Sequence, residues 1–246
     1  MEKKLKENFL KRWKRYFHGA ELPIAFYYSN EETGVELVSA STTNRCLIAN
    51  LIKVRKGTPL RFDADSIGCA GGRRYVGFSY TLRKNFEYFL SCGISGELEG
   101  ERYKKSPELV KAMMARWPKF EAPQKYIVFK RWDEMAETDD PEVVIFFAKP
   151  DVLAGLYTLA GFDELEDRVI APFGAGCASI VQYPYLEKDS DKPHCVIGMF
   201  DPSARPYVPE DALTFAVPMK KFARMVENMD ESFLITTTWG KIKKRI

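Results

Sequence analysis

Two periods of apolar residues alternate along the chain. Near its start, Leu5, Phe9, Trp13 and Phe17 recur at intervals of one helical turn between lysines, which predicts a basic amphipathic helix over residues 2–18. Such a helix can lie on a membrane surface or pack on the protein's own core. We favour the core, because the apolar stripe is narrow and runs directly into an apolar strand.

Short apolar and β-branched runs predict strands between helical segments. The expected strands are 22–29, 60–63, 126–132, 143–148, 195–200, 215–217 and 233–238, and the run 86–92 is a strand or a buried apolar segment. The expected helices are 45–56 with Asn44 as its cap, 73–80 after a glycine turn, 106–117 with Ser106 as its cap, one opening at Pro150, and one after Pro218.

A tripeptide repeats within this pattern. Gly68-Cys69-Ala70 recurs as Gly176-Cys177-Ala178, and shifting the chain by that interval also aligns two apolar helix stripes and two short extended runs. Each half then reads strand, helix, strand, Gly-Cys-Ala, helix, which indicates an internal duplication. The fold class predicted is α+β, or α/β, with a mixed sheet and two related halves.

The expected halves are residues 1–135, with the amphipathic helix leading, and residues 141–246. An acidic segment that ends in Asp139-Asp140-Pro141 connects them, and we expect the two halves to form one compact unit. The place where two similar halves meet is a natural position for a ligand site.

Composition narrows the class of protein. Apolar residues make up 46% and charged residues 29% of the chain, and the net charge of +3 is too small to indicate a nucleic-acid partner. No apolar run is long enough to span a membrane, and the start lacks the core of a signal peptide. Five cysteines without a disulfide pattern indicate free thiols and a cytoplasmic location. The oligomeric state stays open.

Cys69 is the first candidate for chemistry. It lies in a Gly-Cys-Ala-Gly-Gly turn that leads into a helix, where free N–H groups attract anions and favour a thiolate. Gly71 and Gly72 allow a ligand to approach the backbone, and Arg73 and Arg74 add positive charge. The alternative is a tight turn with a small buried cysteine.

Cys177 stands in the same setting, with Gly176 before it and Ser179 at the start of the following helix. If the halves pack about a pseudo-twofold axis, Cys69 and Cys177 approach each other. Cys46, Cys69 and Cys177 then form a three-thiolate set suited to a soft metal or an iron–sulfur centre. The spacing gives this little support, since the chain has no Cys-x-x-Cys and His18 and His194 lack ligand-like partners.

Several motifs resemble the domain-of-unknown-function family 169 of bacteria and archaea. They are Leu22-Pro-Ile-Ala-Phe26, Arg45-Cys46, Gly68-Cys69-Ala-Gly-Gly72 with Gly77, Pro141-Glu-Val-Val144 and Gly176-Cys177. The resemblance extends from about residue 20 to residue 230 and implies that Cys46, Cys69 and Cys177 are the thiols to test. It implies no reaction, because the family is named for lacking one.

Three functions remain open at this point. The first is binding of a small anionic ligand or cofactor between the halves, near Cys69 and Cys177. The second is a thiol-dependent enzyme in which Cys69 is a redox or nucleophilic thiolate. The third is a structural or interaction protein with buried cysteines. No catalytic residue and no cofactor follows from the sequence alone.

Overall fold

The computed structural model describes residues 3–32, 34–39 and 46–246 and centres on a mixed sheet. In this part of the chain the sheet has seven strands in the order β2-β3-β1-β4-β7-β6-β5. All neighbours pair antiparallel except β5 and β6, which are parallel. The strands are β1 (Ile24–Ser29), β2 (Leu60–Phe62), β3 (Tyr126–Arg131), β4 (Val143–Ala148), β5 (Val169–Ile170), β6 (Cys195–Gly198) and β7 (Leu213–Pro218).

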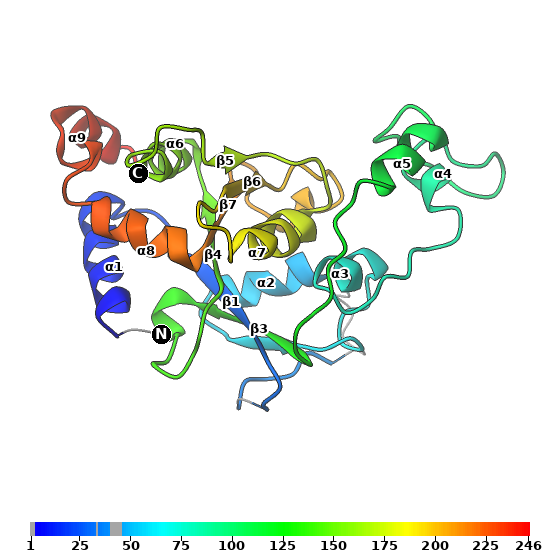
Figure 1. The fold of residues 1–246 in the computed structure, drawn as a ribbon, viewed down its shortest axis with the longest axis horizontal. Helices are drawn as coiled ribbons and strands as arrows, with labels where there is room; N and C mark the ends of the chain where they lie inside the picture. The colour runs from blue at the N-terminus through cyan, green and yellow to red at the C-terminus, as the bar shows by residue number, and fades with distance from the viewer. Residues whose placement is uncertain (1–2, 33, 40–45) are drawn as a thin grey trace.

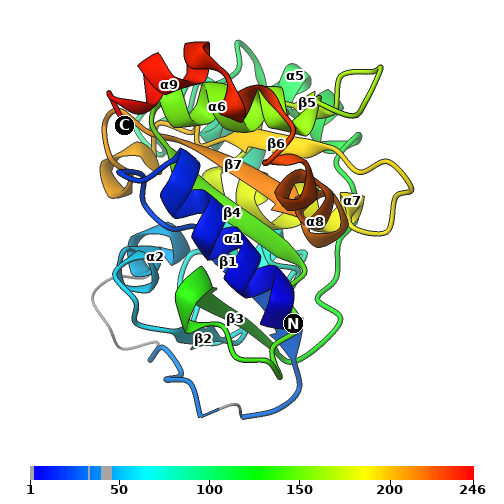
Figure 2. The ribbon, with the colours of Figure 1, turned by 90° about the vertical axis from the view of Figure 1, so that its left-hand side faces the viewer.

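One face of the sheet is covered by one helix from the start of the chain and by helices from its second half (Figure 2). They are α1 (Lys3–Tyr16), α6 (Pro150–Ala160), α8 (Met219–Asn228) and α9 (Thr237–Lys243). Phe9 and Trp13 of α1 are buried against the sheet, so the amphipathic helix packs on the core, as its narrow stripe predicts. The indole nitrogen of Trp239 in α9 donates to the Tyr16 carbonyl at 3.0 Å, which ties the two ends together.

The opposite face carries the three helices that follow the cysteines. They are α2 (Leu47–Arg55), α3 (Ala70–Tyr75) and a helix that begins with the π-helical turn η2 (Ala178–Gln182) and continues as α7 (Tyr183–Glu187). Asn44 and Arg45 lie outside the described residues. The π-helical turn is notable because such turns occur most often at functional sites.

An arm projects from this face, at the right of Figure 1. It comprises residues 79–119 and carries α4 (Phe86–Phe89) and α5 (Pro107–Met114). Its two ends meet where the Ala122 N–H donates to the Gly77 carbonyl at 2.9 Å. Gly77 has a φ of +83°, and a Cβ there would lie 2.4 Å from the Ala122 nitrogen, so only glycine fits at this neck.

The structure confirms the α+β class and most of the expected elements. Ser106 accepts from the Leu109 N–H and caps α5 as predicted, and Phe222, Met225 and Val226 form the buried face of α8. The helix expected at 73–80 begins earlier, at Ala70, and ends at Tyr75, since the glycine turn is itself helical.

The predicted strand 233–238 is wrong, and the run 86–92, expected as a strand or a buried apolar segment, forms no strand. The run 86–92 contains the single-turn helix α4, whose Phe86 and Phe89 lie on one face of that turn. The run 233–238 forms the short 3-10 helix η4 (Phe233–Ile235) and the start of α9, because Ser232 and Thr236 cap these helices. Side-chain caps outweigh the β-branched composition here.

The internal duplication is not confirmed. The expected halves share one sheet, with β1 and β4 as antiparallel neighbours at its centre. A twofold axis between antiparallel neighbours would keep related helices on one face of the sheet. The aligned helices α2 and α6 instead lie on opposite faces. The aligned strands also differ, since β2 pairs antiparallel and β5 pairs parallel.

Candidate functional site

A cavity of about 350 Å³ lies between the arm and the core, on the face that carries α2 and α3. Its walls come from five distant stretches of sequence and are mainly apolar. The core supplies Cys46, Ile48, Cys69 to Gly72, Tyr75, Phe173 to Cys177 and Asp201 to Ala204, and the arm supplies Leu82, Arg83, Phe86, Phe89, Leu90, Glu101, Tyr103, Met113 and Trp117. We call this cavity the arm pocket.

Three cysteines line the arm pocket, and each occupies the position before a helix. Cys46 precedes α2, Cys69 precedes α3, and Cys177 precedes η2. The two Gly-Cys-Ala segments thus meet, although no twofold axis relates them. Cys69 is exposed, Cys46 is half-buried and Cys177 is buried.

Burial keeps two of these thiols protonated. It raises the pKa of Cys177 well above its ordinary value, and the nearby Cys46, Cys69 and Asp201 add to the rise. Burial also raises the pKa of Cys46, although the backbone amides of Ala49 and Ile48 lower it in part. Cys69 is therefore the accessible thiol on the pocket wall.

Asp201 is a pocket residue that the sequence reasoning missed. Its carboxylate accepts from the Gly176 N–H at 3.1 Å, the Ser203 N–H at 3.0 Å, the Ser203 hydroxyl at 2.7 Å and the Tyr103 hydroxyl at 3.4 Å. It thereby occupies the helix start at Gly176, where we expected a bound anion. The signal available was local, since Asp followed two residues later by Ser is typical of an Asx turn.

Three predicted site residues do not line the pocket. The Arg74 guanidinium lies 5.1 Å from the centre of the Trp117 ring and donates to the Tyr80 carbonyl, which holds the arm to the core. Arg73 is half-buried outside the pocket lining. The Ser179 hydroxyl is buried, donates to the Gly176 carbonyl at 2.8 Å and accepts from the Met199 N–H. The role of all three in ligand binding stays a prediction.

The arm contributes aromatic side chains that the sequence reasoning also missed. Ring contacts run from Tyr75 of the core to Trp117, from Trp117 to Phe86, and from Phe86 to Phe89. Tyr75, Phe86 and Trp117 lie far apart in the sequence, so no local pattern brings these three together. Tyr183, Tyr185 and Tyr207 lie outside the pocket lining and pack against the core.

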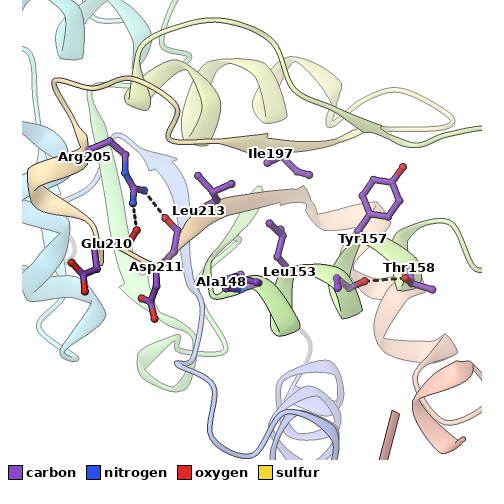
Figure 3. Close-up of a pocket in the computed structure, with 12 residues that line it drawn as sticks. Ala148, Leu153, Tyr157, Thr158, Ile197, Arg205, Glu210, Asp211 and Leu213 are labelled. Carbon is purple, nitrogen blue, oxygen red and sulfur yellow. Dashed lines mark hydrogen bonds between the residues drawn. The ribbon is translucent and has the colours of Figure 1, made fainter. Parts of the chain in front are cut away.

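A second hollow, of about 680 Å³, lies beside α6 at the ends of β4 and β7 (Figure 3). Leu153, Ile197 and Leu213 form its apolar part. Two of its charged groups already have partners, since Arg205 donates to the carbonyls of Pro209, Glu210 and Ala212 and Asp211 pairs with Lys149 at 2.8 Å. It contains no thiol, and we place the candidate site in the arm pocket.

A metal site receives no support from the geometry. Within residues 3–32, 34–39 and 46–246, no group of three or more His, Cys, Asp or Glu side chains is arranged to hold a metal ion. The three thiols line one pocket without forming such a group.

Fold and site together define an α+β protein with a thiol-bearing apolar pocket beneath a helical arm. The model of the DUF169 family, described as uncharacterised ArCR, matches residues 14–228, and the chain belongs to this family. No curated protein and no solved structure matches the chain. None of the helices in the described part of the chain combines the length and the apolar character needed to cross a membrane.

Proposed function

We propose that the protein binds a small, mainly apolar organic molecule in the arm pocket. The observation that carries this proposal is the cavity of about 350 Å³, with apolar walls drawn from five separate stretches of the chain. Small-molecule sites are concave, mostly apolar, and carry a few polar groups that fix orientation. Cys69, Tyr75, Tyr103 and Asp201 are such groups here.

Charge around the pocket favours an apolar ligand over the anionic ligand expected from the sequence. Asp201 and Glu101 line the pocket together with one arginine, Arg83, whose guanidinium lies 4.3 Å from the centre of the Phe89 ring. Arg73 and Arg74 are not part of the wall. An anion would therefore meet two carboxylates and one cation in the wall itself, while Arg74 and Lys104 lie against the lining rings of Trp117 and Phe173.

The arm itself supports a ligand between arm and core. Within residues 79–119, which are all described, the buried residues are Ser91, Gly93, Pro107 and Val110. Phe86, Phe89, Met113 and Trp117 are half-buried and line the pocket. A bound apolar molecule would remove more of these side chains from water, at roughly 25 cal/mol for each Å² buried.

A second candidate is a thiol-dependent enzyme with Cys69 as its nucleophile. It is favoured by one observation, the exposure of the Cys69 thiol on the wall of an apolar pocket. A purely structural role for the cysteines suits Cys195 better, which is fully buried and whose pKa burial raises to about 12.

Titration with the uncharged fluorescent dye N-phenyl-1-naphthylamine tests the proposed function. Gly71 lines the pocket, and a Cβ on it would meet the Cys69 sulfur at 3.7 Å and the Tyr75 ring at 3.9 Å, which are ordinary contacts. Gly71→Leu therefore fills the pocket without forcing the backbone. We expect saturable dye fluorescence in the unmodified protein and at least about a tenfold weaker affinity in Gly71→Leu.

Gly240→Leu is the matched control, because a Cβ at Gly240 meets nothing within 4 Å and Gly240 lies on α9, outside the arm pocket. It should bind the dye as the unmodified protein does. Equal dye affinity in all three proteins, with each folded by circular dichroism, would show that the arm pocket is not the apolar binding site.

A further inference from the structure

The two walls of the arm pocket differ in size of side chain. The core wall consists largely of small residues, and the arm wall consists largely of bulky ones. The small residues are Ala70, Gly71, Gly72, Gly174, Ala175, Gly176 and Ala204; the bulky ones are Leu82, Phe86, Phe89, Leu90, Met113 and Trp117. A smooth wall of glycine and alanine opposite aromatic side chains suits a flat ring, which stacks or packs edge-on against the aromatics.

Gly71, Gly72 and Gly176 respond differently to an added side chain. A Cβ at Gly72 would lie 2.9 Å from the Ile67 side chain, and one at Gly176 would lie 2.8 Å from the Met199 sulfur, so both glycines are needed for packing behind the wall. A Cβ at Gly71 would make only ordinary contacts, with the Cys69 sulfur at 3.7 Å and the Tyr75 ring at 3.9 Å. The space beside Gly71 therefore belongs to the cavity, where a ligand can lie.

The reactive side chains around the arm pocket limit the kinds of reaction that can take place there. Cys69 offers the accessible thiol, while burial leaves Cys46 and Cys177 protonated. Neither histidine lines the pocket: His18 follows α1 on the opposite face of the sheet, and His194 pairs with Glu187 at 2.9 Å. Acyl transfer relies on a base such as imidazole that also returns a proton to the leaving group, whereas the small thiolate fraction of an accessible cysteine adds to an electron-poor C=C bond without a neighbouring histidine.

Of the two phenols in the wall, Tyr103 already donates to Asp201 at 3.4 Å, which leaves Tyr75 as the donor for a ligand. Burial raises the pKa of Tyr75 above its ordinary value and that of Tyr103 to about 12, so both stay protonated near pH 7. Both line the pocket with Cys69. Protonated phenols stabilise negative charge that develops on a carbonyl oxygen.

We propose that the ligand of the arm pocket is a flat, conjugated carbonyl compound of the quinone or enone class, and that the Cys69 thiol adds to it. This rests on the proposed function, since it names the class of molecule that the apolar pocket takes. The sulfur forms a bond to the β-carbon, and the C=C bond opens. Its electron pair moves to the carbonyl oxygen, which takes up the thiol proton. No external oxidant or reductant enters the step.

Naphthoquinone under anaerobic conditions is the probe for the reaction, and Cys92 is the internal control. Cys92 is exposed on the arm outside the pocket, so it reports the intrinsic reactivity of a free thiol. Peptide mass spectrometry after brief exposure gives the ratio of modification at Cys69 to that at Cys92. We expect this ratio to be at least about tenfold larger for naphthoquinone than for iodoacetamide, because the pocket orients the flat ring.

Gly71→Leu should remove this excess and leave modification of Cys92 unchanged. Equal ratios for naphthoquinone and iodoacetamide would overturn the addition step. Flatness is tested separately, by displacement of the dye with naphthol and with its saturated counterpart decalol. Stronger displacement by naphthol is the expected result, and equal displacement overturns the inference.

These outcomes separate the inference from the proposed function. Suppose that Gly71→Leu weakens dye binding, but that the Cys69-to-Cys92 ratios are equal for the two reagents or that naphthol and decalol displace the dye equally. The flat carbonyl ligand is then refuted, and the apolar binding pocket stands. Dye binding that does not depend on Gly71 refutes both.

Discussion

A buried ion pair on β3 shows how single side chains determine stability. Lys130 contacts both carboxylate oxygens of Asp139 at 2.8 Å, and the Tyr27 hydroxyl donates to the same carboxylate at 2.6 Å. Lys130 and Asp139 are 8% and 5% exposed. Burial raises the pKa of Asp139, but the hydrogen bonds from Lys130, Tyr27 and the Ala136 amide outweigh it, so the pKa is lowered in the folded protein.

A lowered pKa makes the contribution of Asp139 depend on pH. The stabilisation is fully present above the unfolded value of about 4 and is lost as pH falls through the lower folded value. Asp139→Asn leaves Lys130 without its buried counter-charge and should lower the free energy of unfolding by about 3–5 kcal/mol near pH 7. Urea unfolding between pH 7 and pH 3 should show the two proteins converging on the acid side. A constant difference across that range would refute this account.

Individual residues also show how much of the site could be predicted from the sequence. Cys69 and Cys177 stand out because glycines flank them before helices, and the structure brings both to one pocket. Trp117 and Tyr103 carry no such local signal, since their role depends on how the arm folds back on the core. A local motif therefore identifies one wall of the pocket, and only the tertiary fold supplies the other.

Helices and strands were predictable where period and length agreed. α1, α6, α8 and the strands β1, β3 and β4 follow their apolar patterns. The runs 86–92 and 233–238 are short and apolar, and such runs do not distinguish a strand from a helix. Ser232 and Thr236, both helix caps, were the signals that could have corrected the second run.

Helix packing predicts that replacing two different glycines by alanine changes the stability of the protein in opposite directions. A Cβ at Gly155 of α6 would lie 2.4 Å from the Trp239 ring and 2.9 Å from Phe17, so Gly155→Ala should destabilise the protein by about 1–3 kcal/mol. A Cβ at Gly240 of α9 meets nothing within 4 Å. Gly240→Ala should stabilise it by about 0.5–1 kcal/mol through helix propensity. Thermal and urea unfolding compare the pair, and equal effects would show that close packing of α6 and α9 is not what requires Gly155.

The arm should open more easily than the sheet. Its helices have few buried residues. Beside the Ala122–Gly77 hydrogen bond at the neck, polar contacts such as Tyr103 with Asp201 and Arg74 with Tyr80 hold it to the core. Amide hydrogen exchange should therefore be faster in α4 and α5 than in β1, β3 and β4. Naphthol bound in the pocket should slow exchange in the arm and leave α9 unchanged. Protection of arm and sheet to the same extent would contradict an independently opening arm.

The whole molecule joins distant segments without internal symmetry. The sheet places β1 and β4 side by side, and both cysteine-bearing turns lie on the face that α6 does not cover. Convergence of the two Gly-Cys-Ala segments thus comes from the shared sheet face and the packing of α3 near η2. The repeated tripeptide predicted that Cys69 and Cys177 lie close together. The structure does not confirm the internal duplication on which that prediction was based.

Charge is distributed unevenly over the same framework. Residues 1–19 contain seven basic and two acidic residues, and residues 237–246 contain four basic and no acidic residues, in a chain with a net charge of only +3. The contact of Trp239 with Tyr16 brings these ends together. Lys4, Lys11 and Lys14 are exposed on α1, and Lys241 and Lys244 are exposed near the end of the chain. The rest of the chain is therefore net acidic. Arg12 and Arg15 pair with Asp230 and Arg245 pairs with Asp151, so the exposed lysines carry the positive charge near α1 and α9.

Ion-exchange behaviour should follow this local charge rather than the net charge. A basic face concentrates positive potential beyond what the overall charge indicates. The protein should bind a sulfonate cation-exchange resin at low salt near pH 7, and Lys11→Glu with Lys14→Glu and Lys244→Glu should abolish retention. The control changes Lys53, Lys56 and Lys119 to Glu, which alters the net charge equally at exposed positions outside α1 and α9. It should elute much later than the first variant, because resin contact selects the most basic side of the molecule. Identical elution of the two variants would show that net charge alone governs binding.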